Sequence, residues 1–340
     1  MKFVGVLGGG NISETHARAV HEIEGLQVTA FCGDNPQRIT RLANLYGGSG
    51  YSDLSEFLTH DPMDLVLIGS PSGLHAEQGT AAARRGLHVL VEKPIDITPA
   101  RAEALISACS QSGVKLGVFF QDRTAPDILK LRSLIQAGTL GRPILVSARV
   151  KWYRPPEYYR NSRWRGTWKL DGGGALMNQG IHTVDLLLWL MGDIVRVQAK
   201  TVTALHSIET EDTVVATLEF ANGAVGTLEA ATSVYPGFPR RIEMTGSEGT
   251  IILEGDRIVS ADLHEKLAEW SPCEGKDSDV RSTSPVISDV GGHERILRDF
   301  VNAIERDETP LCDGSEGRRS VALVQAIYES ARSGGPVIIS

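Results

Sequence analysis

Short apolar runs alternate with helix-like segments through the first third of the 340-residue chain, and this alternation limits the fold more than any other feature. Each intervening segment is long enough for a helix that crosses over a sheet. Such alternation is typical of a parallel sheet covered by helices. The apolar runs are Phe3–Leu7, Leu26–Cys32, Leu65–Ile68, Leu87–Val91 and Val114–Phe120. The helices are predicted at Ser13–Glu24, Pro36–Tyr46, His75–Arg85 and Pro99–Ser110.

The pattern changes after Gln121, where a second domain is predicted to begin. A helix is predicted near Pro126–Ala137, a strand at Ile144–Tyr153 and a glycine-led helix from about Gly174 to Met191. Several β-like runs follow, and an antiparallel meander is their simplest interpretation. These runs are Val195–Ala204, Thr213–Phe220, Ala224–Thr232, Arg241–Thr245 and Thr250–Leu253. The predicted domains are residues 1–123, an α/β domain, and residues 124–340, an α+β domain.

Helices on one face of the second sheet would leave its other face to be covered, and a second subunit is a common solution. We therefore expect a homodimer or homotetramer that assembles through this sheet. Residues 271–292 are rich in Ser, Asp and Gly and are predicted to form a loop. Helical patterns return at Glu294–Ile304 and Gly317–Ala331, and Val337–Ile339 is a candidate closing strand.

Composition favours small soluble ligands over macromolecules or membranes. The net charge of -8 argues against a general nucleic-acid surface. No apolar run approaches the roughly 18 residues that a membrane helix requires, and Met1-Lys2 leads directly into a strand-like run without a signal sequence. The four cysteines show neither metal-type spacing nor a disulfide framework, so we expect a cytoplasmic protein.

A glycine-rich turn follows the first apolar run and resembles a dinucleotide-binding fingerprint. Gly8 and Gly10 occupy its first two glycine positions and Ser13 the third. Gly8 permits a tight turn, and Gly10 lets the backbone approach a pyrophosphate, whose charge is favoured by the amides of the following helix. Asn11 and Ile12 begin that helix and belong to the predicted cofactor site.

The second apolar run ends close to Asp34, the acidic residue available there to bind the adenosine ribose. A carboxylate at this position bonds the ribose hydroxyls and repels a 2′-phosphate, which favours NAD over NADP. The competing interpretation is that Asp34 caps the helix containing Pro36. Arg38 is an alternative phosphate contact, so NADP is not excluded.

Val91-Glu92-Lys93-Pro94 closes another apolar run. Pro94 cannot donate to a sheet, so the chain must turn there, and Lys93 is predicted at the carboxyl end of a strand. That edge of a parallel sheet is where ligands bind. Taken alone, Glu92-Lys93-Pro94 favours the simpler interpretation, an exposed lysine before a turn.

Four motifs in order make the chain resemble the Gfo/Idh/MocA oxidoreductase family over essentially its whole length: the glycine turn, Ser70-Pro71-Ser72-Gly73-Leu74-His75, Glu92-Lys93-Pro94, and Gly172-Gly173-Gly174 followed by His182. The resemblance implies a Rossmann domain, a second domain with a large, mostly antiparallel sheet, and NAD(P)-dependent chemistry on sugars or polyols. It implies catalytic roles for Lys93 and His182 and a cis Lys93–Pro94 bond. It places Ser72, His75 and Glu92 on the nicotinamide side, and Ser70, Lys93 and Gln121 complete the predicted cofactor contacts.

The chain departs from the family at Asn178, where many members carry an aspartate four residues before the histidine. Asn178 cannot take a proton, so proton transfer would rest on Lys93 and His182. Helical spacing predicts Asn178, His182 and Asp185 on one face. Two of them could bind a metal, but without a third ligand we predict none. The substrate-binding candidates are Lys93, Tyr153, Arg163, Trp168, Asn178 and His182.

These patterns predict oxidation of a secondary alcohol, with hydride passing to the nicotinamide and Lys93 or His182 accepting the hydroxyl proton. An alternative is a redox-assisted glycoside hydrolase that regenerates its NAD. A second alternative is a non-catalytic regulator that binds NAD or a sugar, against which the presence of Lys93 and His182 argues.

Overall fold

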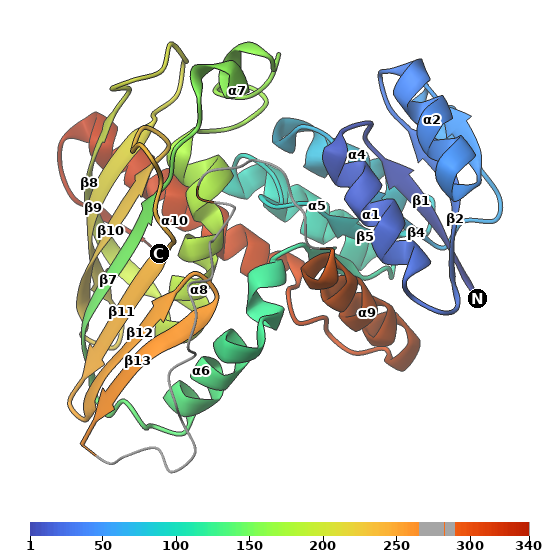
Figure 1. The fold of residues 1–340 in the computed structure, drawn as a ribbon. Helices are drawn as coiled ribbons and strands as arrows, with labels where there is room; N and C mark the ends of the chain where they lie inside the picture. The colour runs from blue at the N-terminus through green and yellow to red at the C-terminus, as the bar shows by residue number, and fades with distance from the viewer. Residues whose placement is uncertain (265–281, 283–289, 340) are drawn as a thin grey trace. The chain divides into compact units, whose positions relative to one another are not determined.

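The computed structural model describes residues 1–264, 282 and 290–339, which belong to two compact units (Figure 1). The first unit is drawn from residues 1–121 and 286–321, and the second from residues 122–285 and 322–340. The structure therefore differs from a single division at residue 123, since part of the C-terminal region packs with the N-terminal sheet. Phe300 lies so close to Gly117 that a Cβ there would be 2.8 Å from the ring, and the Val118 amide donates to the Cys312 carbonyl.

The first unit contains a parallel sheet of six strands in the order β3-β2-β1-β4-β5-β6. Its strands are β1 (Lys2–Leu7), β2 (Leu26–Cys32), β3 (Ser49–Tyr51), β4 (Leu65–Ile68), β5 (His88–Val91) and β6 (Leu116–Val118). Its helices are α1 (Asn11–His21), α2 (Pro36–Tyr46), α3 (Leu54–Phe57), α4 (His75–Ala83), α5 (Pro99–Gln111) and α9 (Gly291–Arg306). The four residues of β4 are all buried, as expected of a strand covered on both faces. The predicted parallel sheet is confirmed, whereas β3 and α3 are too short to leave a periodic pattern.

The second unit contains an eight-stranded sheet in the order β13-β12-β11-β7-β10-β9-β8-β14. Its strands are β7 (Pro143–Lys151), β8 (Ile194–Val202), β9 (Thr213–Phe220), β10 (Val225–Ala231), β11 (Arg241–Gly246), β12 (Gly249–Glu254), β13 (Arg257–Leu263) and β14 (Val337–Ile338). The sheet is mostly antiparallel, as predicted. A simple meander is wrong, because β7 lies between β10 and β11 and pairs in parallel with β10.

The helices of the second unit include α6 (Pro126–Gln136), α7 (Pro156–Arg160) and α8 (Ile181–Met191), together with the end of α10 (Gly314–Ser333). The predicted continuous helix from Gly174 is interrupted, since Ala175–Gly180 form a π-helical turn before α8. The apolar side chains of α8 pack into the core, with Ile181 and Val184 fully buried. His182 and Asp185 on the same helix are buried as well.

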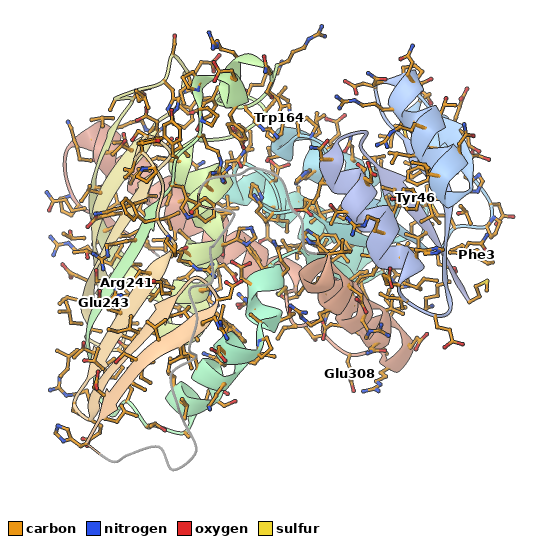
Figure 2. All side chains as sticks on the ribbon, in the orientation of Figure 1. Phe3, Tyr46, Trp164, Arg241, Glu243 and Glu308 are labelled. Carbon is orange, nitrogen blue, oxygen red and sulfur yellow. The ribbon has the colours of Figure 1, made fainter. Side chains whose placement is uncertain are left out.

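One face of the second sheet remains exposed in the described residues. On β9, Val214, Ala216 and Leu218 are buried while Val215, Thr217 and Glu219 alternate with them and are exposed. Arg241 and Glu243 form an ion pair of 2.7 Å on β11 (Figure 2). None of the described helices is both long and apolar enough to cross a membrane.

Two sequence predictions concern segments that the structure describes only in part. Most of the predicted loop 271–292 lies outside the described residues, and its last two positions begin α9. Cys32, Cys109 and Cys312 are buried free thiols, while Cys273 lies outside the described residues. Burial raises the pKa of Cys32 to about 11 and that of Cys109 to about 12, so these thiols are unreactive.

The glycine run before the π-helical turn packs against a buried Glu211–Tyr328 pair. Glu211 accepts hydrogen bonds from the Gly174 and Leu176 amides and from the Tyr328 hydroxyl, at 3.0, 2.8 and 2.9 Å. Burial nevertheless raises the pKa of Glu211 to about 7. A Cβ at Gly174 would lie 1.9 Å from the Glu211 carbonyl oxygen, and one at Gly173 2.1 Å from the Tyr328 hydroxyl. Close packing within this unit therefore requires these glycines.

Replacing Gly174 with Ala should destabilise the second unit by about 3 kcal/mol or more, because backbone rather than a movable side chain blocks the new methyl group. A Cβ at Gly335 meets nothing within 4 Å, so Gly335→Ala is the matched control. Thermal unfolding should show a Tm at least ~5 °C lower for the first variant only. Equal Tm values for the two variants would contradict the packing argument.

Candidate functional site

The carboxyl ends of β1, β2, β4, β5 and β6 bring the predicted cofactor residues of the first unit to one edge of the sheet. Gly8 follows β1, Ser70 follows β4, Lys93 follows β5 and Gln121 lies just beyond β6. β1 and β4 are neighbours although they are not consecutive in the chain, so the strand order reverses between them. Open parallel sheets bind ligands at such a reversal.

The glycine turn has separate structural and ligand-related requirements. Gly8 adopts φ +126°, and a Cβ there would lie 2.7 Å from the Gly69 carbonyl oxygen, so the fold itself requires glycine. Gly10 is the N-cap of α1, and a Cβ there would meet nothing within 4 Å. The helix start has no side-chain cap, and the fully buried Ser13 fills the third glycine position. The turn therefore fits a pyrophosphate that approaches Gly10.

Asp34 lies exposed between β2 and α2. The cap of α2 is Asn35, whose side chain accepts the Arg38 amide at 3.0 Å. The competing interpretation of Asp34 as the helix cap is therefore wrong, and the carboxylate is left available for another partner. Arg38 is also exposed, one helical turn away.

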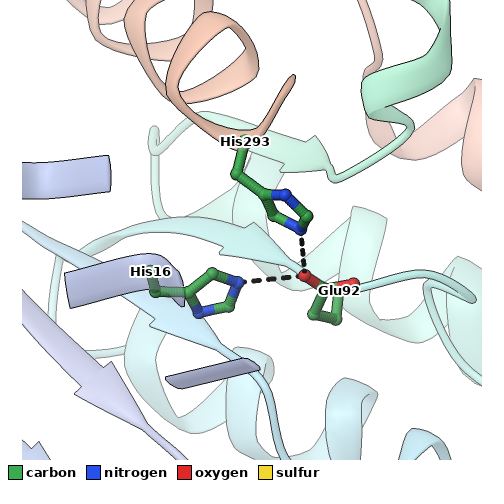
Figure 3. Close-up of side chains that lie close together, drawn as sticks. All are labelled: His16, Glu92 and His293. Carbon is green, nitrogen blue, oxygen red and sulfur yellow. Dashed lines mark hydrogen bonds and ion pairs between the residues drawn. The ribbon is translucent and has the colours of Figure 1, made fainter. Parts of the chain in front are cut away.

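Glu92 is a buried carboxylate that is held by two histidines from distant parts of the first unit (Figure 3). His16 Nε2 on α1 lies 3.0 Å from Glu92 Oε1, and His293 Nε2 on α9 lies 3.2 Å from the same oxygen. Burial by itself raises the pKa of Glu92, but the hydrogen bonds from the two imidazoles reverse this and hold it well below its ordinary range. Burial lowers the pKa of His16, with Glu92 acting against it. Glu92 is thus a carboxylate that receives N–H donors.

The same three residues are the group that could hold a metal ion among the described residues, since their donor atoms lie within 4.8 Å of one another. Histidine ligands of metals normally donate their second ring N–H to another group. The Nδ1 atoms of both His16 and His293 are buried and have no hydrogen-bond partner among the residues that the structure describes. We therefore interpret the cluster as a hydrogen-bonded carboxylate.

The turn at Lys93 is joined to neighbouring loops through backbone oxygens. The Lys93–Pro94 bond is cis, as expected. His75 Nδ1 and Nε2 lie 2.8 Å from the Pro94 and Ser70 carbonyl oxygens. Burial lowers the pKa of His75, and the two carbonyl acceptors act in the opposite direction. Ser72 is buried in the intervening turn, and the Ser70 hydroxyl donates to Gln78. These loops are therefore linked by their own polar groups.

His182 in the second unit lies beside a buried network of opposite charges. Its Nδ1 is 3.8 Å from Asp122 Oδ2, and Asp122 also binds Arg240. Arg123 makes a two-pronged contact with Asp185, at 2.8 and 2.6 Å. Asp185 is thus engaged by an arginine.

Asn178 lies on the π-helical turn, where the even α-helical spacing assumed from the sequence does not apply. Its Nδ2 donates to Asp171 Oδ1 at 2.5 Å, and its Oδ1 accepts from Gln179 Nε2 at 2.8 Å. Asn178, His182 and Asp185 therefore contact different groups. A carboxylate is present beside position 178, but Asp171 supplies it.

The remaining predicted substrate residues lie in the second unit with differing exposure. Tyr153 follows β7 and packs edge-on against Tyr235, with ring centroids 5.2 Å apart. Arg163 and Trp168 are exposed after α7, and Trp168 contacts the Tyr328 ring edge-on.

Sequence reasoning missed His16, His293 and Asp122. Each is an isolated residue whose neighbours are set by packing between distant segments, since 201 positions separate His293 from Glu92. An isolated histidine in an amphipathic helix leaves no local signal. His16 and His293 are identified only by the packing of α1 against α9, and Asp122 only by its ion pair with Arg240.

Replacing His16 with Gln, which keeps an N–H at a similar reach, should lower stability by about 1 kcal/mol at pH 7.5. The folded pKa of His16 is lowered, so its stabilising contribution is present above the ordinary value of 6.5 and is lost as pH falls below that value. The stability difference between wild type and variant should therefore shrink between pH 7.5 and 5.5, by at most ~1.4 kcal/mol per pH unit. Denaturant unfolding at both pH values measures this difference. A difference that grows in acid would show a raised pKa instead.

Comparisons with known proteins support the expected relationship. A model described as the oxidoreductase family, NAD-binding Rossmann fold, matches residues 2–120, and a model of the GFO/IDH/MocA C-terminal domain matches residues 128–252. The WlbA dehydrogenase from Bordetella pertussis, solved with NADH and UDP-GlcNAcA, is 33% identical with a TM-score of 0.89, covering 100% of this chain and 99% of that chain.

Curated relatives are less identical in sequence but also match over nearly the whole of this chain. The D-apiose dehydrogenase of Paraburkholderia graminis is 26% identical over 347 residues, covering 99% of this chain and 89% of its own. The myo-inositol 2-dehydrogenase of Thermotoga maritima is 25% identical over 335 residues, covering 96% and 95%. The motifs, the two sheets and these matches together show that the chain belongs to the Gfo/Idh/MocA oxidoreductase family.

Proposed function

We propose that the protein is an NAD(P)-dependent dehydrogenase that oxidises a secondary alcohol of a sugar, polyol or sugar derivative. The observation that carries this proposal is the placement of the Gly8–Gly10 turn and Lys93 on one edge of the parallel sheet. The family model and the relatives named as dehydrogenases support it.

The first unit supplies the proposed cofactor site. The turn from Gly8 to Ile12 would bind the pyrophosphate, and the exposed Asp34 would bind the ribose, which favours NAD. Arg38 remains the contact through which NADP would be accepted. The nicotinamide, when bound, accepts hydride from the alcohol carbon.

Proton transfer is proposed to rest on Lys93 and His182, each in its own unit. Lys93 lies half-buried just beyond the carboxyl end of β5, at the edge of the parallel sheet where ligands bind. His182 is 8% exposed, and the Asp122 carboxylate near its Nδ1 would stabilise the charged ring after it takes a proton. Asn178 is proposed to hydrogen-bond a substrate hydroxyl. Tyr153, Arg163 and Trp168 are the further proposed substrate contacts.

The domains are proposed to divide these tasks, with residues 1–123 binding the cofactor and residues 124–340 binding substrate and forming the oligomer. The described residues within 286–321 belong to the first compact unit and modify this division. Within this class, nucleotide sugars are the first substrates to test, because the relative at 33% identity was solved with UDP-GlcNAcA.

Replacing Lys93 with Ala should lower kcat by about 100-fold or more, since positioned proton-transfer groups contribute on the order of 10²–10⁴. The assay follows nicotinamide reduction with NAD and NADP across nucleotide sugars, polyols, free sugars and glycosides. The exposed Lys130→Ala is the control, and it should match wild type. Glycoside cleavage without net reduction would contradict the dehydrogenase and favour the redox-assisted hydrolase. Ligand binding without turnover of any compound would also contradict the dehydrogenase, and it would favour the non-catalytic regulator.

We also propose that the protein is cytoplasmic and forms a homodimer or homotetramer through the exposed face of the second sheet. Leu145 and Val225 are paired across β7 and β10 and are 49% and 51% exposed. Val215 on β9 is 53% exposed. These apolar side chains on an otherwise charged face favour a self-contact.

Replacing Val225 with Lys should dissociate the proposed oligomer, because the symmetry of the contact places the new charge twice in the interface. Light scattering coupled to size-exclusion chromatography measures the mass. Leu45→Lys, at a 59% exposed position of α2 in the first unit, is the comparison and should leave the mass unchanged. A wild-type mass of one chain would contradict the proposal.

A further inference from the structure

We propose that His293 is a positioning residue that acts through Glu92 to hold the backbone of Lys93 in place. The inference rests on the proposed role of Lys93 but concerns a residue in the C-terminal part of the chain. His293 lies in the first turn of α9, far in sequence from the Glu92-Lys93-Pro94 motif. Within the first unit the two are in direct contact.

Glu92 connects His293 to Lys93 through its two carboxylate oxygens. Oε1 accepts the Nε2–H groups of His16 and His293, and Oε2 accepts the Lys93 amide at 3.3 Å. An ionised carboxylate has enough lone pairs for all three donors. Because the histidines fix one oxygen, the direction of the other oxygen toward Lys93 is fixed as well.

The donor rings themselves are immobilised by packing. His16 stacks on Phe119 with centroids 4.6 Å apart, and His293 contacts the same ring at 5.2 Å. A Cβ at Gly292 would lie 3.1 Å from Gln121 Cγ, so the start of α9 has little freedom to move. His16 and His293 are 0% and 1% exposed. Water therefore does not readily replace a lost donor.

Charge makes the second histidine necessary. A buried carboxylate is costly unless enough donors surround it, and burial alone raises the pKa of Glu92. The charged or titratable groups that face it are His16 on α1, His293 on α9, His75 on α4 and the adjoining Lys93. Without His293, Glu92 would take up a proton at a higher pH or turn away. Either change removes a fixed negative partner beside Lys93.

The test begins with a readout that needs no substrate. Lysine acetylation of the free protein, mapped by peptide mass spectrometry, reports the reactivity of Lys93 relative to the exposed Lys130. In His293→Leu the Lys93 amide is no longer held by Glu92, and the negative charge near Lys93 is reduced. Labelling of Lys93 should therefore rise about threefold or more at pH 7 to 8. A threefold change corresponds to the loss of ~0.7 kcal/mol of restraint. His293→Gln keeps an N–H donor and should remain close to wild type. His206→Gln, which alters a buried histidine of the second unit, is the control for general loosening.

Kinetics then separate positioning from stability. With a substrate found in the panel, the low-pH limb of the kcat profile should move to lower pH in His293→Leu, because the negative charge beside Lys93 is weaker, while the KM for that substrate changes little. His206→Gln should lower stability without moving the limb. If the Leu variant does not fold, His293→Asn, whose shorter amide cannot reach Glu92 Oε1, replaces it.

Three results would overturn the inference. Unchanged Lys93 labelling in a folded His293→Leu protein would show that the contact does not reach Lys93. A uniform loss of kcat at every pH would show a structural role only. One equivalent of zinc in the wild-type protein, lost in His293→Leu, would show that the Nε2 atoms bind metal rather than Glu92. If no panel compound is turned over, the proposed function fails, while the labelling result still decides the contact.

Discussion

The parallel pairing of β1, β4 and β5 is the constraint on which the rest of the first unit depends. Parallel strands run in one direction, so the turns that follow them meet at one edge. The glycine turn, the Ser70 loop and Lys93 come from segments separated by dozens of residues, yet pairing places them side by side. The candidate site depends on this arrangement, because none of the three turns holds all of its residues.

Much of the fold could be predicted because its elements are long and locally consistent. β2, β4, β9 and α2 occur at the predicted residues, since apolar runs and the Pro36 start signal specify them. Local pattern could not predict that β7 pairs in parallel with β10, because strand order is a long-range property. The π-helical turn was also missed, since the sequence that forms it has ordinary helical composition.

Part of the candidate site could be predicted from the sequence for the same reason. The sequence identified Gly8, Gly10 and Lys93 through short motifs that follow predicted strands. It left Asp34 as either the ribose contact or the helix cap, and the hydrogen bond from the Arg38 amide to Asn35 identifies Asn35 as the cap. The motif that contains Gly173 and Gly174 does not reveal that Tyr328 and Glu211 pack against them. A small residue next to a site is equally compatible with ligand and with protein contact until its neighbours are known.

The first unit is discontinuous in the chain, and this has a consequence for synthesis. As the chain emerges from the ribosome, the first 121 residues can begin to form their sheet, but α9 is made only after most of the second unit. Until then Glu92 has one of its two imidazole donors, and the apolar surface around Phe119 and Gly117 lacks His293 and Phe300. The surroundings of Glu92 in the first unit are thus completed last. An isolated fragment ending near residue 123 would retain the glycine turn, but its Glu92 carboxylate would lack the hydrogen bond from His293.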